Sequence, residues 1–204
     1  MQTLTYLFPD YDGIGGVIKQ RPSDFLVEEI PLYEPGGAGE HVYCEIEKTG
    51  LSTFSAIRLM ADALNISARD IGYAGMKDQD AVTRQTLSLQ RTDEATVSRL
   101  EIPGIAIRWV ARHGNKLRLG HLAGNRFAIK IRDVSATDIV RVRPLLQRIQ
   151  HMGMPNYFGQ QRFGHRADNH LFGVAVLASD NKMILHLLLG DPRPEVDPPD
   201  IIKA

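Results

Sequence analysis

Apolar and polar residues alternate with a period of two in several stretches of the chain, a pattern typical of strands. Residues 40–48 carry Val42, Cys44 and Ile46 on one face and polar or amphipathic side chains on the other, which predicts a half-buried strand. Residues 25–30 form a second strand candidate, and residues 72–90 are typical of a short strand, a loop and a longer strand. Three more strands are predicted for residues 105–113, 116–122 and 126–134.

Glycine pairs and helical spacing predict how these strands are connected. Gly114-Asn115 suits a tight hairpin turn, and Gly124-Asn125 is expected to separate the next two strands. A helix is predicted over residues 52–64, capped by Ser52 or Thr53. Helices are also expected over residues 140–152, with Pro144 at a kink or in the first turn and Gly153 as the stop, and as a short pair over residues 169–189.

Strands that are neighbours in the sequence, with helices at irregular intervals, predict an α+β fold. We expect a mixed, mostly antiparallel sheet with flanking helices, which forms one domain over residues 1–190. Residues 191–204 are rich in proline and acidic residues and are expected to be a poorly ordered tail. The glycine-rich residues 35–39 are expected to form a flexible loop.

Composition narrows the class of protein. The chain has 204 residues, of which 43% are hydrophobic and 24% charged, as is usual for a globular protein. No apolar run is long enough for a transmembrane helix, and the N-terminus lacks the pattern of a secretory signal. The single cysteine, Cys44, excludes a disulfide scaffold and suits a reducing compartment. We therefore expect a cytoplasmic protein without a membrane partner.

Charge is balanced over the whole chain but not along it. Lysine plus arginine and aspartate plus glutamate both number 24. Residues 108–132 nevertheless hold seven basic residues and no acid, and strand alternation places Arg126, Lys130 and Arg132 on one face. This face is either a solvated surface or a surface that contacts phosphate groups, and the absence of acids favours phosphate contacts.

Several motifs for other chemistries are absent. His165 and His170 lack the spacing of a helical zinc pair, so no metal site is predicted. Gly13, Gly15 and Gly16 form neither a dinucleotide fingerprint nor a phosphate-binding loop. The sequence therefore shows neither of these nucleotide-binding motifs.

The segment that carries chemistry is residues 72–85, in which glycines precede Lys77 and Asp78. Glycine permits close approach of a ligand to the backbone. An aspartate beside Lys77 and near Arg84 is favoured in its ionised form, which suits nucleophilic or general-base work. The alternative is a turn aspartate that accepts a hydrogen bond from its own backbone.

Four segments of the chain together resemble the TruD family of tRNA pseudouridine synthases. They occur in the family's order, and their sequences are KQRPSDFLVE at residues 19–28, AGMKD with AVTRQ at 74–78 and 81–85, GNRF at 124–127, and PNYFGQQRFG at 155–164. The resemblance implies a pseudouridine-synthase-like catalytic domain. It also implies cofactor-free isomerisation of a tRNA uridine to pseudouridine, with position 13 expected from the family.

The resemblance assigns the catalytic carboxylate to Asp78, and not to Asp80. Whether Asp78 would attack the sugar C1′ or take a proton from C2′ stays open. A uridine in folded RNA must be flipped out and held by aromatic and amide-type contacts. By this resemblance, Phe25 and Phe127 match positions that line the uridine pocket and Asn125 matches a binding position, with core packing as the alternative for the two rings. Three cations are candidates for contacts to phosphate or carboxylate groups: Lys19, Lys77 and Arg84.

The chain departs from the family in its length after Gly164. Family members continue into an inserted domain and then return to complete the catalytic domain, so a returning segment is expected to be missing here. A sheet without it would expose an edge or depend on a second chain. Two alternatives to a synthase therefore stay open: a non-catalytic RNA-binding module, and a carboxylate nuclease, although the chain shows no acid cluster for the metal that a nuclease needs.

Overall fold

The computed structural model describes residues 6–164 and 166–190. The chain divides into two compact units within helix α3 (Ala136–Met152), between Arg143 and Pro144. Residues 8–143 form the first unit, and the described residues 6–7 and 144–190 belong to the second. The assignment of residues 1–190 to one catalytic domain stays a prediction. The expected tail, 191–204, and His165 lie outside the described residues.

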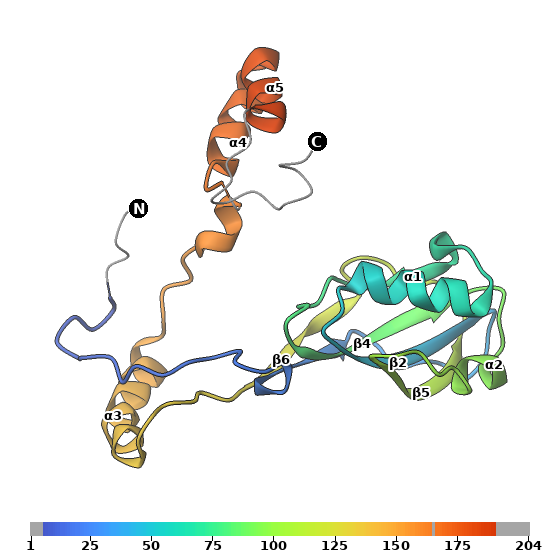
Figure 1. The fold of residues 1–204 in the computed structure, drawn as a ribbon, viewed down its shortest axis with the longest axis horizontal. Coiled ribbons are helices and arrows are strands. Elements are labelled where there is room, and N and C mark those ends of the chain that lie inside the picture. The colour runs from blue at the N-terminus through green and yellow to red at the C-terminus, as the bar shows by residue number, and fades with distance from the viewer. Residues whose placement is uncertain (1–5, 165, 191–204) are drawn as a thin grey trace. The chain divides into compact units, whose positions relative to one another are not determined.

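The first unit is built on a six-stranded mixed sheet with the order β5-β2-β4-β1-β6, in which β3 also pairs with β4 (Figure 1). Only the β1–β4 pair is parallel among the pairs in this sheet of the described chain. The α+β class with a mostly antiparallel sheet is thereby confirmed. The strands are β1 (Phe25–Pro31), β2 (His41–Thr49), β3 (Ile71–Tyr73), β4 (Val82–Leu89), β5 (Ile105–His113) and β6 (Leu122–Ile129).

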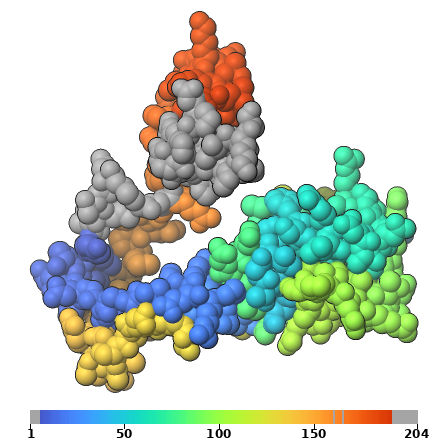
Figure 2. All heavy atoms as spheres, viewed as in Figure 1, coloured from blue at the N-terminus to red at the C-terminus, as the bar shows by residue number. Residues whose placement is uncertain are grey.

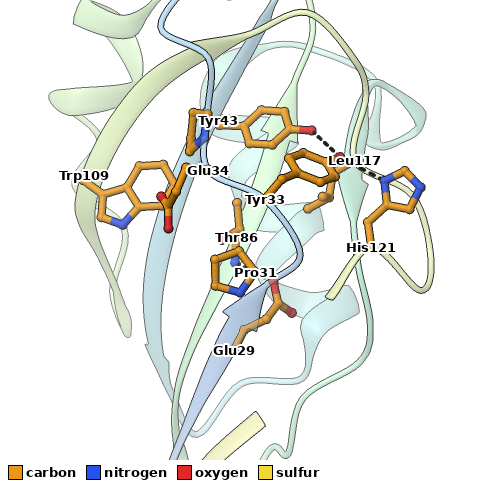
Figure 3. Close-up of a pocket in the computed structure, with 10 residues that line it drawn as sticks. Glu29, Pro31, Tyr33, Glu34, Tyr43, Thr86, Trp109, Leu117 and His121 are labelled. Carbon is orange, nitrogen blue, oxygen red and sulfur yellow. Dashed lines mark hydrogen bonds between the residues drawn. The ribbon is translucent and has the colours of Figure 1, made fainter. Parts of the chain in front are cut away.

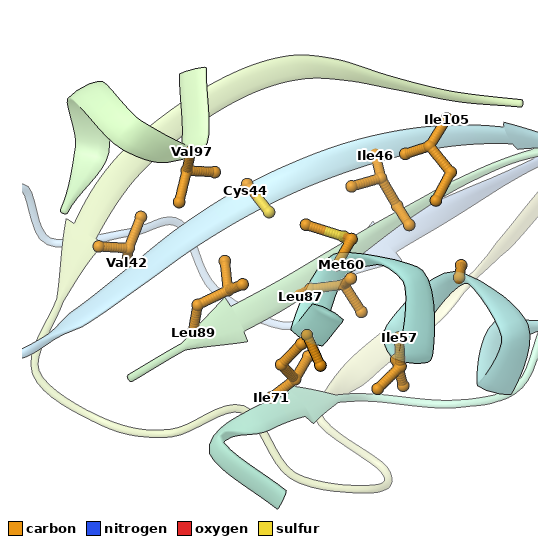
Figure 4. Close-up of a cluster of buried hydrophobic side chains, with 12 residues drawn as sticks. Val42, Cys44, Ile46, Ile57, Met60, Ile71, Leu87, Leu89, Val97 and Ile105 are labelled. Atoms are coloured by element: carbon orange, nitrogen blue, oxygen red, sulfur yellow. The ribbon is translucent and has the colours of Figure 1, made fainter. Parts of the chain in front are cut away.

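One face of the sheet is covered by helix α1 (Thr53–Leu64). Ser52 caps its start by accepting a hydrogen bond from the Ser55 N–H, and Asn65 ends it in the left-handed region with φ of 52°. Met60 and Ile57 of α1 pack with Cys44 of β2 and with other buried residues from β2, β3 and β4 (Figure 4). This cluster is the main core of the first unit.

The short helix α2 (Glu94–Ser98) closes the same core through Val97, which is fully buried. Its side chains pack against β5, and the space-filling view shows α1 in cyan and the α2–β5 region in yellow-green as parts of one densely packed body (Figure 2). Two 3-10 turns complete this unit, η1 (Pro22–Asp24) before β1 and η2 (Ala68–Asp70) before β3.

The strand predicted for residues 116–122 and the hairpin at Gly114-Asn115 are wrong. Residues 114–121 cross the sheet as an irregular segment whose backbone bonds to side chains of distant strands. The Leu117 N–H donates to Ser88 Oγ over 2.9 Å, and the Asn115 carbonyl accepts from the Tyr43 hydroxyl at the same distance. Tyr43 and Leu117 are consequently buried, so β2 is more than half-buried.

The separation expected at Gly124-Asn125 is also wrong, because both residues lie inside β6. This strand pairs with β1, at the opposite end of the sheet from β5, and places Gly124 beside Ile30. The strand predicted for residues 126–134 therefore begins earlier and ends at Ile129. The backbone groups of Gly124 and Asn125, which were expected to form a turn, instead form hydrogen bonds with strand β1.

The remaining helices are α3, α4 (Asn169–Leu177) and α5 (Asn181–Leu189), with the 3-10 turn η3 (Gln160–Phe163) before α4. The predicted pair over residues 169–189 is confirmed. Helix α3 begins four residues before the predicted start, Pro144 lies inside it, and Gly153 follows its end with φ of 75°. None of the helices in residues 6–164 and 166–190 combines the length and the apolar character of a membrane span.

Candidate active site

The loop between β3 and β4, residues 74–81, carries Asp78 and is anchored by buried polar side chains. The Lys77 N–H donates to Thr53 Oγ1 over 2.9 Å, and the Thr53 hydroxyl donates to Gln85 Oε1 over 3.0 Å. The Gln85 amide in turn donates to the Gly75 carbonyl over 3.4 Å. Helix α1 and strand β4 thus fix the backbone of this loop through side chains that have almost no solvent exposure.

Asp78 projects its carboxylate from this loop with 42% of the side chain exposed. Lys19 Nζ lies 2.9 Å from Asp78 Oδ1 and 4.1 Å from the centre of the Phe25 ring. Lys19 itself has a φ of 60°, in the left-handed region that is uncommon for residues other than glycine. One ammonium therefore connects the candidate carboxylate to an aromatic ring at the start of β1.

Phe25 and Phe127 meet edge to face, with ring centroids 6.0 Å apart. Phe25 is buried with Val27 and Ala81, whereas Phe127 on β6 is 54% exposed. Asn125 is exposed two residues before Phe127, on the same face of β6. Lys19, Phe25 and Phe127 are therefore brought together around Asp78, and Asn125 shares their face.

Lys77 and Arg84 form ion pairs within the chain. Lys77 Nζ lies 2.8 Å from Glu29 Oε2, and both side chains are almost fully buried. Arg84 contacts Glu28 and Glu47 over 2.5 and 2.7 Å. Because Gln85 faces α1, alternation along β4 places Arg84 on the opposite face of the sheet. The assignment of these two cations to RNA stays a prediction.

The basic stretch gains acidic neighbours on folding. Arg132 binds Asp24 through two hydrogen bonds of 2.6 and 2.7 Å, and the Arg132 guanidinium lowers the pKa of that carboxyl. Arg126 lies 3.5 Å from Glu28. Residues 108–132 contain no acidic residue, but acidic residues from other segments lie beside them in the folded chain. This weakens the argument for phosphate contacts.

Two of the best-formed pockets in the described residues are not lined by Asp78, Phe25 or Phe127. The first has a volume of about 10 Å³ and lies between Tyr33, Tyr43 and Trp109, with the Tyr33 hydroxyl 3.0 Å from His121 Nδ1 (Figure 3). That volume holds about one water molecule and no nucleobase. Asp78 instead lies at an open surface.

Lys48 was missed as a site residue. It is fully buried, and its Nζ donates to the carbonyls of Asp78 and Leu51 over 2.8 and 2.6 Å. The alternation along β2 contained the signal, because Lys48 continues the apolar positions 42, 44 and 46. A lysine on the apolar face of a strand needs a buried partner.

Comparisons with known proteins identify relatives of the chain. A family model described as tRNA pseudouridine synthase D (TruD) matches residues 2–203. The tRNA pseudouridine synthase D of Geobacter metallireducens is 52% identical over 187 residues, which are 92% of this chain and 46% of the relative. That of Sulfurimonas denitrificans is 42% identical over 164 residues, or 80% of this chain and 46% of the relative.

A solved structure from Methanosarcina mazei, named as tRNA pseudouridine synthase D (TruD), has the same fold. It superposes with a TM-score of 0.77 at 29% sequence identity and covers 95% of this chain and 45% of that one. The chain thus spans about half the length of the relatives that it matches.

Proposed function

Because the chain belongs to the TruD family of tRNA pseudouridine synthases, we propose that it contributes Asp78 and its neighbours to a site that isomerises a tRNA uridine to pseudouridine. The proposed reaction breaks the C1′–N1 bond and forms a C1′–C5 bond. The C5 proton leaves and N1 gains a proton, so the composition is unchanged and no redox cofactor is needed. Position 13 is the expected target, as the resemblance implies.

The observation that carries the proposal is the contact between Asp78 and Lys19 beside two aromatic rings. The ion pair with Lys19 orients the Asp78 carboxylate, and a carboxylate is a group that can act either as a nucleophile or as a general base. The exposed ring of Phe127 is available to stack on a flipped uracil, and Phe25 supports it from the side. Asn125 would supply amide hydrogen bonds to the edge of the base.

The tRNA partner and a cytoplasmic location belong to the same proposal. The outer edge of β6 is the end of the described sheet, and Phe127, Ile129 and Ile131 beside it are each 45–54% exposed. Such a surface suits either the half of the relatives' length that this chain does not span or a second chain. If neither covers it, the alternative of a non-catalytic RNA-binding module is favoured.

The experiment is incubation of the chain with an unmodified tRNA transcript, followed by mapping of pseudouridine. It is run with the chain alone and with the chain fused to the part of the Geobacter metallireducens relative that this chain does not match. Asp78→Asn should abolish product while RNA affinity is kept. Asp80→Asn, an exposed aspartate two residues away, is the matched control and should have a mild effect.

Product formed by Asp78→Asn at the parent rate would contradict the catalytic assignment. RNA binding without product in both the chain and the fusion would support the binding module instead. Product in the fusion alone would show that the open face needs the second half of the family's length.

A further inference from the structure

A buried cation, Lys48, binds the backbone carbonyl of Asp78, whose carboxylate is partly exposed to solvent. Lys48 is at the end of β2 and has no solvent exposure. Its ammonium donates to the Asp78 carbonyl over 2.8 Å and to the Leu51 carbonyl over 2.6 Å. Leu51 lies in the turn that leads into α1, so one side chain ties the Asp78 loop to the start of that helix.

The placement of this charge is energetically unfavourable in itself. Burial lowers the pKa of Lys48 to about 8, against a raising effect from Asp78 and a further lowering from Lys77. These two charged groups, both on the Asp78 loop, are the ones that act on it. An apolar side chain of the same length would fill the space without desolvating an ammonium. The two carbonyl bonds are what the lysine adds.

The rest of the loop is held independently of Lys48. Thr53 and Gln85 bind the backbone at Lys77 and Gly75, respectively. Lys19 binds the Asp78 carboxylate from the solvent side, where a substrate would approach. Loss of Lys48 therefore leaves most of the loop anchored and frees the backbone at Asp78.

We propose that Lys48 is a positioning residue, which fixes the Asp78 backbone from the protein interior so that its carboxylate faces the uridine. The inference rests on the proposed function of Asp78. The protonated form holds the two carbonyls more strongly than the neutral amine, since charge-assisted hydrogen bonds are the stronger kind. Turnover should therefore decline as Lys48 loses its proton.

The test compares Lys48→Met and Lys48→Arg with the parent chain, in the same isomerisation assay and fusion as above. Lys48→Met should lower kcat by about 100-fold, the effect of misplacing a catalytic group by about 1 Å, with a much smaller change in KM for tRNA. The parent kcat should fall above a pH of about 8. Lys48→Arg stays charged throughout this range, so it should retain more activity than Lys48→Met and should not show that fall.

Ile46→Ala is the matched control for lost stability, because Ile46 is fully buried on the same face of β2. Amide hydrogen exchange of residues 75–80 is measured alongside. Lys48→Met should speed exchange in this loop more than Ile46→Ala does at equal global stability. Equal loop exchange in the two variants would overturn the proposal, as would kcat losses that simply follow stability.

The exchange measurement needs no turnover, so it separates this proposal from the function on which it rests. Faster loop exchange in Lys48→Met without any product from the parent or the fusion would retain the positioning role and refute the isomerase. If Lys48→Met does not fold, Lys48→Arg provides the test. Loop exchange at the parent rate in Lys48→Arg then supports the proposal, and a parent-like fall of kcat near pH 8 in that variant refutes it.

Discussion

Lys77→Met should destabilise the chain strongly, because it leaves the Glu29 carboxylate buried without its cation. The Nζ–Oε2 distance is 2.8 Å, and the exposed fractions of the two side chains are 4% and 2%. Removal of one partner from a buried pair costs about 3–5 kcal/mol of unfolding free energy. This is a large share of the total stability of a domain, about 5–15 kcal/mol.

The double variant Lys77→Met, Glu29→Gln should recover much of this loss. Glutamine keeps an oxygen that can accept the hydrogen bond of the Thr86 N–H, which donates to Glu29 Oε1 over 3.2 Å. Thr86 lies between the part of β4 that pairs with β1 and the part that pairs with β3. The expected coupling between the two substitutions is about 2 kcal/mol. Urea unfolding followed by circular dichroism measures this coupling. Lys130→Met is the control, because this lysine is exposed after β6, and it should lower the free energy of unfolding by less than about 0.5 kcal/mol.

The same measurement separates a structural role of Lys77 from the RNA contact that the sequence predicted. A lysine that binds phosphate would, when replaced, weaken RNA affinity and leave unfolding nearly unchanged. A loss below about 1 kcal/mol in Lys77→Met, or simple additivity in the double variant, would refute the argument from the buried pair.

Phe127→Ala should lower the free energy of unfolding by much less than the loss of about 3–5 kcal/mol that is typical of a buried phenylalanine, because the ring is 54% exposed. The same change should strongly reduce isomerisation. A melting-temperature loss in proportion to the lost activity would refute the stacking role. The Arg132 guanidinium lowers the pKa of Asp24, so stability should fall as the pH drops below about 4, and unfolding at several pH values measures this. Arg132→Gln should reduce the fall without abolishing it, because the pKa values of Asp93 and Asp138 are also lowered. Burial raises the pKa of Cys44 to about 12, so a thiol reagent should react only as the chain unfolds, and fast labelling of the native chain would contradict this.

Local patterns predicted the strands and helices whose own side chains repeat with a clear period of two or of three to four residues. Alternation found β1 and β2, and helical spacing with a serine cap found α1. The prediction failed for residues 114–125, where Gly-Asn pairs are typical of turns. There the backbone bonds to Tyr43, to Ser88 and to strand β1, partners that are distant in the sequence. A short-range signal does not contain such contacts.

The candidate site likewise contains residues that the sequence predicted and residues that it did not. Motif residues such as Lys19 and Asp78 were found because they occur in recognisable segments, and the structure brings them into contact. The buried supports were missed, because Lys48 and Thr53 act through single hydrogen bonds to backbone atoms of a loop on another element. Residue type alone does not identify such a bond. The alternation along β2 did indicate that Lys48 is buried, because it continues the apolar positions 42, 44 and 46.

The order of strands also bears on how the chain folds. Strands β2 to β5 come from residues 41–113 and enclose the core under α1, whereas β1 pairs with β6 across the intervening residues 32–121. Closing so long a loop is slow and entropically costly, so the β1–β6 ribbon should join a core that has already formed. It should also be the first part of the sheet to open in native-state fluctuations. Phe25 and Phe127 would then separate from Asp78 while the core stays intact, so the stability of this ribbon would be one determinant of substrate affinity.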